Sequence, residues 1–219
     1  GPGSLTTARN WAATIPNSTG SPTLTACTWC TPAAARTTTI SSATVPHRAL
    51  RFYVMGERGA VHDEVPTESE IECMGALLEE ALNAGALGFT TSRTTKHRAK
   101  DGRLVPSLSA REPELAGLAL AMKRAGRGVL EVNSDFGPGK FQAMQDAATI
   151  AGRPLSCLLV QVRQHPRLWR ETLNWIHDMR AEGIEATAQV ASRGIGIMMG
   201  LETTLHPFAG HPAWLEMRH

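Results

Sequence analysis

The fold of this chain is decided by the stretch Gly85-Ala86-Leu87-Gly88-Phe89-Thr90-Thr91-Ser92-Arg93, after which a polar loop runs to Pro106. The apolar and β-branched residues of this stretch predict a short buried strand over Ala86–Thr91. An amphipathic helix is expected directly before the strand. In proteins built from strand–helix units, the loops at the carboxyl ends of parallel strands surround the substrate crevice. The polar loop is therefore where we expect the chemistry of the molecule.

The helix before this strand is predicted over Thr67–Ala84. Thr67 is a suitable N-cap and Glu70 stands three residues later, which is the pattern of a capping box. Gly85 provides a stop signal at the other end. The apolar residues that recur at helical spacing are Ile71, Met74, Leu77, Leu78, Ala81 and Leu82.

Strands and helices are expected to alternate along most of the chain, which favours an α/β fold with a parallel sheet and right-handed crossovers. Five strands are countable, or six if Gly194–Met199 is one. A complete (β/α)₈ barrel needs about 250 residues, so the prediction is a partial TIM-type barrel. The other predicted elements are strands at Ala49–Met55, Gly128–Asn133, Leu155–Gln161 and Glu185–Ala191, and helices at Ala110–Ala125, Lys140–Ala151 and Leu168–Ala181.

An open barrel of this kind leaves its edge strands unpaired and exposes inner faces that we expect to be apolar. Both features favour self-association, so a homo-oligomer formed through the sheet edge is predicted.

The composition narrows the classes of function. The chain has 219 residues, 42% of them hydrophobic, and a net charge of +2 from 22 basic and 20 acidic residues. Nothing in this balance favours a nucleic-acid partner or a membrane surface. The four cysteines lack the spacing of a disulfide framework, which indicates a reducing compartment. With no apolar run of transmembrane length, a soluble cytoplasmic protein is expected.

The first part of the chain differs in composition from the rest. Residues 1–4 read as a scar of an expression tag, and residues 5–43 are rich in Thr, Ala, Ser and Pro without helical or strand periodicity. We expect an irregular segment there, and our hypothesis is that it is a frameshifted remnant. Its Cys27 and Cys30 form a CxxC pair. A zinc site needs two further ligands at suitable spacing, and a redox site needs a strand-to-helix turn, and the sequence shows neither. The α/β domain is assigned to residues 44–219.

Several blocks of the sequence, taken in order, resemble one enzyme family. The quoted stretch at Gly85–Arg93 is similar to the "GA-x-GF-(S/T)-T-(S/G)-R" segment of metal-dependent amidohydrolases of the N-acyl-D-amino-acid deacylase (D-aminoacylase) type. Further similar blocks cover much of residues 44–215. They include Val45–Arg51 with Val54–Gly56, Arg153–Gln161, Leu168–Trp169, Thr187–Ala191, Gly200–Glu202, and His206–Pro212.

This resemblance implies zinc-dependent hydrolysis of N-acyl-D-amino acids or related amides. Family members hold the metal through a His-x-His pair, further histidines and an aspartate, and the metal activates water and polarises the carbonyl. None of the eight histidines of this chain is separated from another by a single residue. We therefore expect the isolated chain to be inactive. The alternative is a non-catalytic remnant or a partner-binding α/β fragment.

Candidate site residues follow from the resemblance and from the predicted strand ends. His47 matches a family histidine and is the candidate metal ligand, with edge packing as the alternative. Asp135 follows a strand and is the candidate general base, with Glu131 and Ser134 nearby. Helix capping is the alternative for that loop.

The candidates for substrate binding lie in two further places. Arg93 and His97 belong to a basic loop, with Lys96 and Arg98, that is suited to gripping a carboxylate. Gln189 and Arg193 close another strand as polar wall residues. His206 and His211 are interpreted as parts of a structural turn, because proline makes their segment irregular.

Overall fold

The computed structural model describes residues 43–99, 102–135, 140–161, 165–192, 194, 196, 198–203 and 206–217. Its centre is one parallel sheet with the strand order β1-β2-β3-β4-β5, so each strand lies beside its neighbour in sequence. The chain is therefore α/β with consecutive strand–helix units, as predicted, and this order is compatible with a partial barrel. The strands are β1 (Thr44–Pro46), β2 (Gly88–Arg93), β3 (Val129–Ser134), β4 (Leu155–Leu158) and β5 (Ala186–Gln189).

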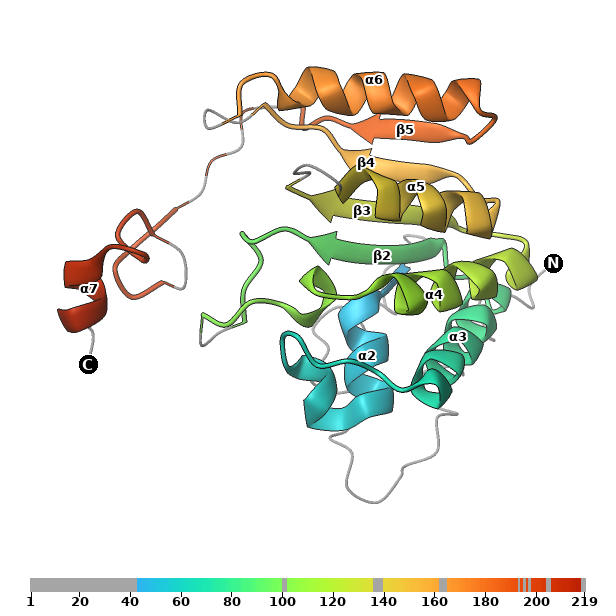
Figure 1. The fold of residues 1–219 in the computed structure, drawn as a ribbon, viewed down its shortest axis with the longest axis horizontal. Helices are drawn as coiled ribbons and strands as arrows, with labels where there is room; N and C mark the ends of the chain where they lie inside the picture. The colour runs from blue at the N-terminus through green and yellow to red at the C-terminus, as the bar shows by residue number, and fades with distance from the viewer. Residues whose placement is uncertain are drawn as a thin grey trace, which may run out of the picture.

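Helices connect the strands and cover one face of the sheet. Figure 1 shows α4 and α5 running across the same side of the strands, while α7 stands apart from the sheet. The helices are α2 (His47–Met55), α3 (Glu68–Asn83), α4 (Glu112–Ala125), α5 (Lys140–Ala151), α6 (Leu168–Ala181) and α7 (Pro212–Met217), with short 3-10 turns η3 (Gly56–Ala60) and η4 (Pro106–Leu108). None of the helices in the described ranges is long and apolar enough to cross a membrane.

The predicted start of α3 is confirmed in detail. The Thr67 hydroxyl accepts from the Glu70 backbone N–H at 3.2 Å, and the Glu70 carboxylate accepts from the Thr67 N–H at 2.8 Å. This capping box satisfies two donors that would otherwise be unpaired at the helix start. After the helix, Gly85 has φ +110, a conformation that side chains rarely adopt. At Gly88, an added Cβ would lie 2.0 Å from the Val129 carbonyl oxygen, so β2 and β3 need glycine there.

The strand predicted over Ala49–Met55 was wrong, because that segment belongs to α2. The residues that α2 buries stand at His47 and three, four and eight positions after it, as on one face of a helix: His47, Leu50, Arg51 and Met55. Two of them are polar or charged, so hydrophobicity alone did not reveal the helical period. The strand of this unit is β1, directly before the helix.

The remaining predicted strands exist, but they begin or end at slightly different residues, and β4 and β5 are shorter than expected. No strand is assigned among the described residues of Gly194–Met199. The boundary at residue 43 and the interpretation of residues 5–43 fall almost wholly outside the described residues, as do Cys27 and Cys30.

The two faces of the sheet differ sharply in character. Side chains alternate between faces along a strand, and parallel register keeps partners on the same face. One face supplies the core, through Val45, Phe89, Leu130, Val132, Leu155, Cys157 and Ala186. The opposite face, here called the polar face, is mostly polar and also carries the apolar Pro46, Val129 and Leu158; its polar members are Thr90, Ser92, Glu131, Asn133, Ser156, Thr187 and Gln189. The expectation of an apolar inner face was therefore wrong for most of its positions, because most apolar residues of these strands lie on the helix-covered side.

Candidate functional site

The carboxyl ends of β2 and β3 meet at one edge of the sheet, and Asp135 fixes the loop that leaves this edge. Its carboxylate accepts from the Thr94 hydroxyl at 2.6 Å, and from the Thr95 N–H and hydroxyl at 2.7 and 2.8 Å. Lys96 Nζ lies 3.5 Å away. Burial acts to raise the pKa of Asp135, but these hydrogen bonds and Lys96 outweigh it and hold the pKa below its usual value. Asp135 thus anchors a loop. Because its carboxylate already accepts these hydrogen bonds and has a lowered pKa, it is a weaker base than the general base that the sequence suggested.

His97, in that loop, approaches the end of β2. Its Nδ1 lies 2.5 Å from the Ser92 hydroxyl oxygen, on the side of the polar face. Burial lowers the pKa of His97, the positive charges of Arg48 and Lys96 lower it further, and Asp135 opposes them. The imidazole is therefore mostly neutral near pH 7, so Nδ1 accepts a hydrogen bond from the Ser92 hydroxyl.

Arg93 points to the other side of the sheet from Ser92. Its guanidinium donates to the backbone carbonyls of Ser107 at 3.2 Å and Ala110 at 3.0 Å, holding the segment that leads into α4. Burial lowers the pKa of Arg93, although Glu114 opposes this shift. The structure therefore does not bring Arg93 together with His97 as one basic grip.

The other predicted substrate-binding residues lie at a different strand or outside the described residues. Gln189, at the end of β5, donates through Nε2 to the Ser156 hydroxyl at 2.8 Å, so it belongs to the polar face. Arg193 falls outside the described residues. Glu131 lies in the middle of the polar face, in register with Thr90 and Ser156.

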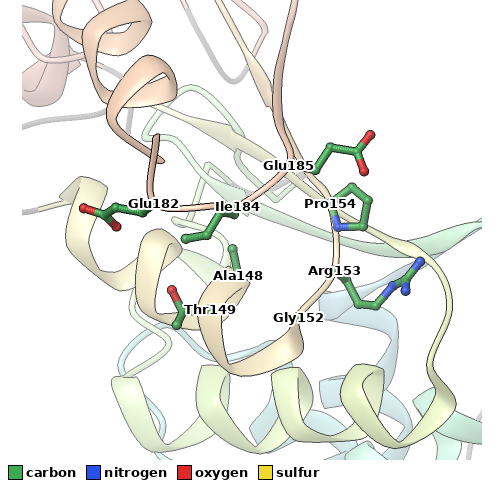
Figure 2. Close-up of a pocket in the computed structure, with 9 residues that line it drawn as sticks. Ala148, Thr149, Gly152, Arg153, Pro154, Glu182, Ile184 and Glu185 are labelled. Atoms are coloured by element: carbon green, nitrogen blue, oxygen red, sulfur yellow. The ribbon is translucent and has the colours of Figure 1, made fainter. Parts of the chain in front are cut away.

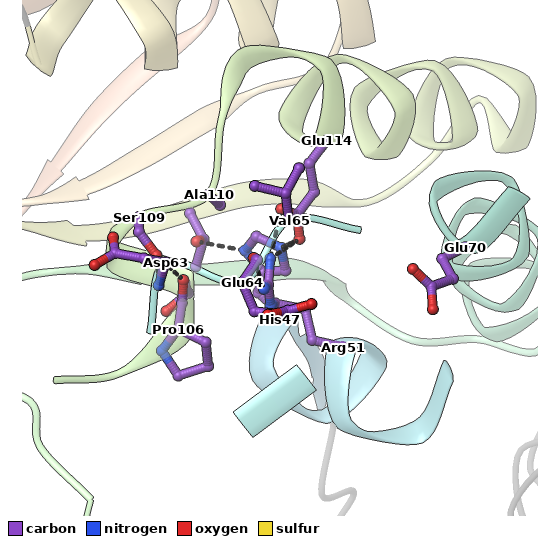
Figure 3. A network of polar contacts seen from close by, with 12 residues as sticks. His47, Arg51, Asp63, Glu64, Val65, Glu70, Pro106, Ser109, Ala110 and Glu114 are labelled. Atoms are coloured by element: carbon purple, nitrogen blue, oxygen red, sulfur yellow. Dashed lines mark hydrogen bonds and ion pairs between the residues drawn. The ribbon is translucent and has the colours of Figure 1, made fainter. Parts of the chain in front are cut away.

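His47 is buried in a polar network on the helix-covered side. Its Nδ1 lies 2.9 Å from the Thr91 hydroxyl, and its Nε2 lies 2.8 Å from Glu114. Arg51 reaches both oxygens of the same carboxylate, at 2.8 and 2.6 Å. Figure 3 shows His47 and Arg51 rising from α2 to converge on Glu114 of α4. All three side chains are buried, so the network joins α2, α4 and β2.

The protonation states in this network follow from its charges. Burial lowers the pKa of His47, and Arg51 and Arg93 add to this effect against the opposing influence of Glu114. For Glu114, burial acts to raise the pKa, but His47 and Arg51 outweigh it and the pKa is lowered. We assign a neutral His47 that donates from Nε2 to an ionised Glu114 and accepts at Nδ1 from Thr91.

Glu114 was missed as a functional residue by sequence reasoning. A signal was present, because Glu114, Leu118 and Met122 lie four apart and share the buried face of the helix predicted at Ala110–Ala125. A carboxylate in such a row needs a buried cationic or hydrogen-bonding partner. Arg51 and His47 meet that need here.

The described residues do not suit the zinc ion that the resemblance implies. Both ring nitrogens of His47 are already engaged within hydrogen-bond distance. Within the described ranges, no group of three or more His, Cys, Asp or Glu side chains could hold a metal ion. His206 packs against Trp214 with ring centroids 4.7 Å apart, and His211 accepts from the Ala213 N–H beside α7. These contacts of His206 and His211 agree with the interpretation of both histidines as parts of a structural turn.

A hollow of about 390 Å³ lies at the opposite, amino end of the sheet. Figure 2 shows it between the end of α5 and the turn before β5. Parallel α/β folds place their ligands at the carboxyl ends of the strands, so this hollow is the weaker candidate. Its lining consists of Ala148, Thr149, Gly152, Arg153, Pro154, Glu182, Gly183, Ile184 and Glu185.

Comparisons with known proteins add no relative to this description: no family model, curated protein or solved structure matches the chain.

Proposed function

We propose that this chain is a partial TIM-type barrel related to the metal-dependent amidohydrolases. In this proposal it binds N-acyl amino acids or related amides and, as an isolated chain, does not hydrolyse them. The sequence resemblance over much of residues 44–215 and the run of parallel strand–helix units support it. The observation that carries the binding proposal is the loop at residues 94–99, which Asp135 fixes at the carboxyl ends of β2 and β3.

The charges and hydrogen-bonding groups of this edge suit such a ligand. Arg48 and Lys96 each act electrostatically on His97, and all three side chains reach the surface. Asp135 offsets the charge of Lys96, and the remaining positive charge of Arg48 attracts a carboxylate to this edge. The hydroxyl and amide groups of the polar face are suited to the amide of an acyl amino acid, as both donors and acceptors.

The proposed lack of hydrolysis rests on the position of His47, the candidate metal-binding residue. Metal-dependent hydrolysis needs an ion that activates water and stabilises the developing negative charge. His47 is turned into the buried network with Thr91 and Glu114, away from the polar face where the ligand is proposed to bind.

Two measurements on the full 219-residue chain test the proposal. In the first, N-acetyl-D-leucine is titrated while backbone amide NMR signals are followed. We expect shifts at Thr95, Lys96 and His97, weakened in Lys96→Ala and unchanged in the control Lys123→Ala, which removes a cation from the last turn of α4. In the second, release of D-leucine is assayed with added zinc, and no turnover above buffer is expected.

The two halves of the proposal fail separately. Absence of shifts at the loop contradicts ligand binding there. Zinc-dependent turnover that a chelator abolishes contradicts the proposed inactivity. It would mean that the isolated chain is a metal-dependent hydrolase.

A second candidate function, as a partner-binding or self-associating α/β fragment, is favoured by one observation. Large apolar side chains after β5 remain exposed, and Met198 is 98% exposed. Exposed apolar residues in one segment are typical of interaction surfaces. The others in this part of the chain are Val190, Met199, Leu201, Phe208, Leu215 and Met217.

A further inference from the structure

Ser92 and His97 form a close pair at the carboxyl end of β2. The distance of 2.5 Å between Ser92 Oγ and His97 Nδ1 places a hydroxyl and a base within direct proton-transfer reach. Both lie at the edge of the sheet where α/β proteins bind ligands. This pair is separate from the buried His47 network, whose hydroxyl belongs to Thr91 on the other face.

One neighbouring side chain can supply a hydrogen-bond donor that acyl transfer uses. Asn133 is the register partner of Ser92 on β3, so its side chain stands on the same face at about one interstrand spacing, roughly 5 Å. Its amide makes no side-chain hydrogen bond within the described part of the chain. An amide donor beside a nucleophile is suited to stabilising the oxyanion of a tetrahedral intermediate.

The position of His97 is also controlled. Its loop is tied to Asp135 through Thr94 and Thr95, and both of those residues lie within three positions of the imidazole. The charged groups that act on His97 are Arg48 from α2, Lys96 from its own loop and Asp135 from the end of β3. Their combined effect with burial keeps the imidazole neutral near pH 7, which is the state that accepts a proton.

We propose that Ser92 is a nucleophile and His97 its general base, and that the pair accepts the acyl group of small aryl esters. The Ser92 oxygen bonds to the ester carbonyl carbon while its proton passes to His97 Nδ1. The bond to the aryl oxygen then breaks, and its electron pair departs with the phenolate. Water next attacks the acyl-serine, releasing the carboxylic acid and restoring the Ser92 hydroxyl, and His97 returns its proton to solvent.

Aryl esters are the substrate class because a stabilised phenolate leaves without receiving a proton, so the pair needs no additional acid. The inference uses the same loop as the proposed N-acyl amino acid site, but it does not depend on that ligand, and its burst and acetylation readouts stand whether or not N-acetyl-D-leucine binds. It also requires no metal, so a chelator distinguishes it from zinc-dependent hydrolysis.

The test uses p-nitrophenyl acetate with the full chain in the presence of a chelator. We expect a burst of p-nitrophenolate and a single acetyl group that peptide mass spectrometry locates on Ser92. The burst is abolished in Ser92→Ala and slowed about 100-fold in His97→Gln, within the usual range for loss of a general base. Ser69→Ala and His177→Gln are the controls, since both remove exposed side chains elsewhere on the molecule, and they leave the burst unchanged.

A second pair of measurements separates this chemistry from a structural role. The acylation rate of the unaltered chain should rise with pH, with a midpoint below 6.5, and level off by pH 7, because His97 has a lowered pKa. Ser92→Cys should retain the burst on the new thiol. Acetylation spread over lysines at the same rate in Ser92→Ala, or a rate that rises steadily with hydroxide, overturns the proposal.

Discussion

The Nε2 atom of His47 lies 2.8 Å from Oε1 of Glu114, and the two residues are 67 positions apart in the sequence. Arg51 binds the same carboxylate from the next turn of α2. One carboxylate therefore joins α2 to α4.

Replacing Glu114 by Ala should destabilise the fold strongly. The substitution leaves Arg51 buried without its carboxylate, and breaking a buried ion pair in this way costs about 3–5 kcal/mol. Urea unfolding followed by circular dichroism measures the loss. Glu112→Ala removes an exposed carboxylate from the same helix turn and should cost far less. Equal losses in the two variants would show that the network contributes little.

The stability of the fold should fall as the solution is acidified, in two stages. The folded pKa of His47 is below 6.5, so the unfolded state binds protons first and stability declines as pH falls from about 6.5. The pKa of Glu114 is also lowered, so its contribution is present above about 4.5 and is lost below that value. Unfolding free energies measured between pH 8 and 3 test this, and His47→Gln should reduce the first stage. A stability maximum below pH 5 would contradict the assigned protonation states.

Thr67→Ala should lower the unfolding free energy by about 1 kcal/mol, the usual cost of removing an N-cap side chain. Thermal and urea unfolding measure it. The matched control is Glu72→Ala, an exposed position within the same helix that makes no cap. If both variants lose the same stability, general helix propensity explains the effect and the capping box does not.

Asp135→Ala should release the loop at residues 94–99 while leaving the sheet intact. The Thr95 N–H loses its acceptor at 2.7 Å. A hydrogen bond to a charged group contributes about 1.5–3 kcal/mol, so hydrogen exchange at Thr95 should speed up by at least tenfold. Asp146→Ala removes a half-buried carboxylate from α5, far from the loop, and serves as the control. Unchanged exchange at Thr95 would mean that the loop is held by other contacts.

The chain should associate in solution, at least as a dimer. The sheet is open among the described residues, with β1 and β5 at its edges, and unpaired edges favour pairing with another chain. Light scattering at increasing concentration should therefore report a mass above the 23.5 kDa of one chain. A constant monomer mass at high concentration would refute the expectation.

The parts of the fold that sequence predicted well have strong local signals. Thr67 and Glu70 define the start of α3 by a motif whose hydrogen bonds are all local. The helices Lys140–Ala151 and Leu168–Ala181 have the bounds that were predicted. In each case, spacing within one segment contains most of the required information.

The parts that sequence predicted poorly depend on contacts between distant segments. Arg51 and His47 are buried because Glu114 stands opposite them, which no local pattern in α2 reveals. Asp135 was identified as a site residue, but its ties to Thr94 and Thr95 cross 40 positions or more. The pairing of Ser92 with His97 is local in sequence, yet it requires the loop to fold back over the strand end.

The polar face also limits how two copies can meet. Glu131 stands at its centre between Thr90 and Ser156, so stacking two such faces would bury carboxylates against each other at a large desolvation cost. Edge-to-edge contact avoids that cost. If the contact has a twofold axis perpendicular to the sheet, each edge strand runs antiparallel to its own copy. The combined sheet of a symmetric dimer would thus be parallel within each protomer and antiparallel at a single junction between them.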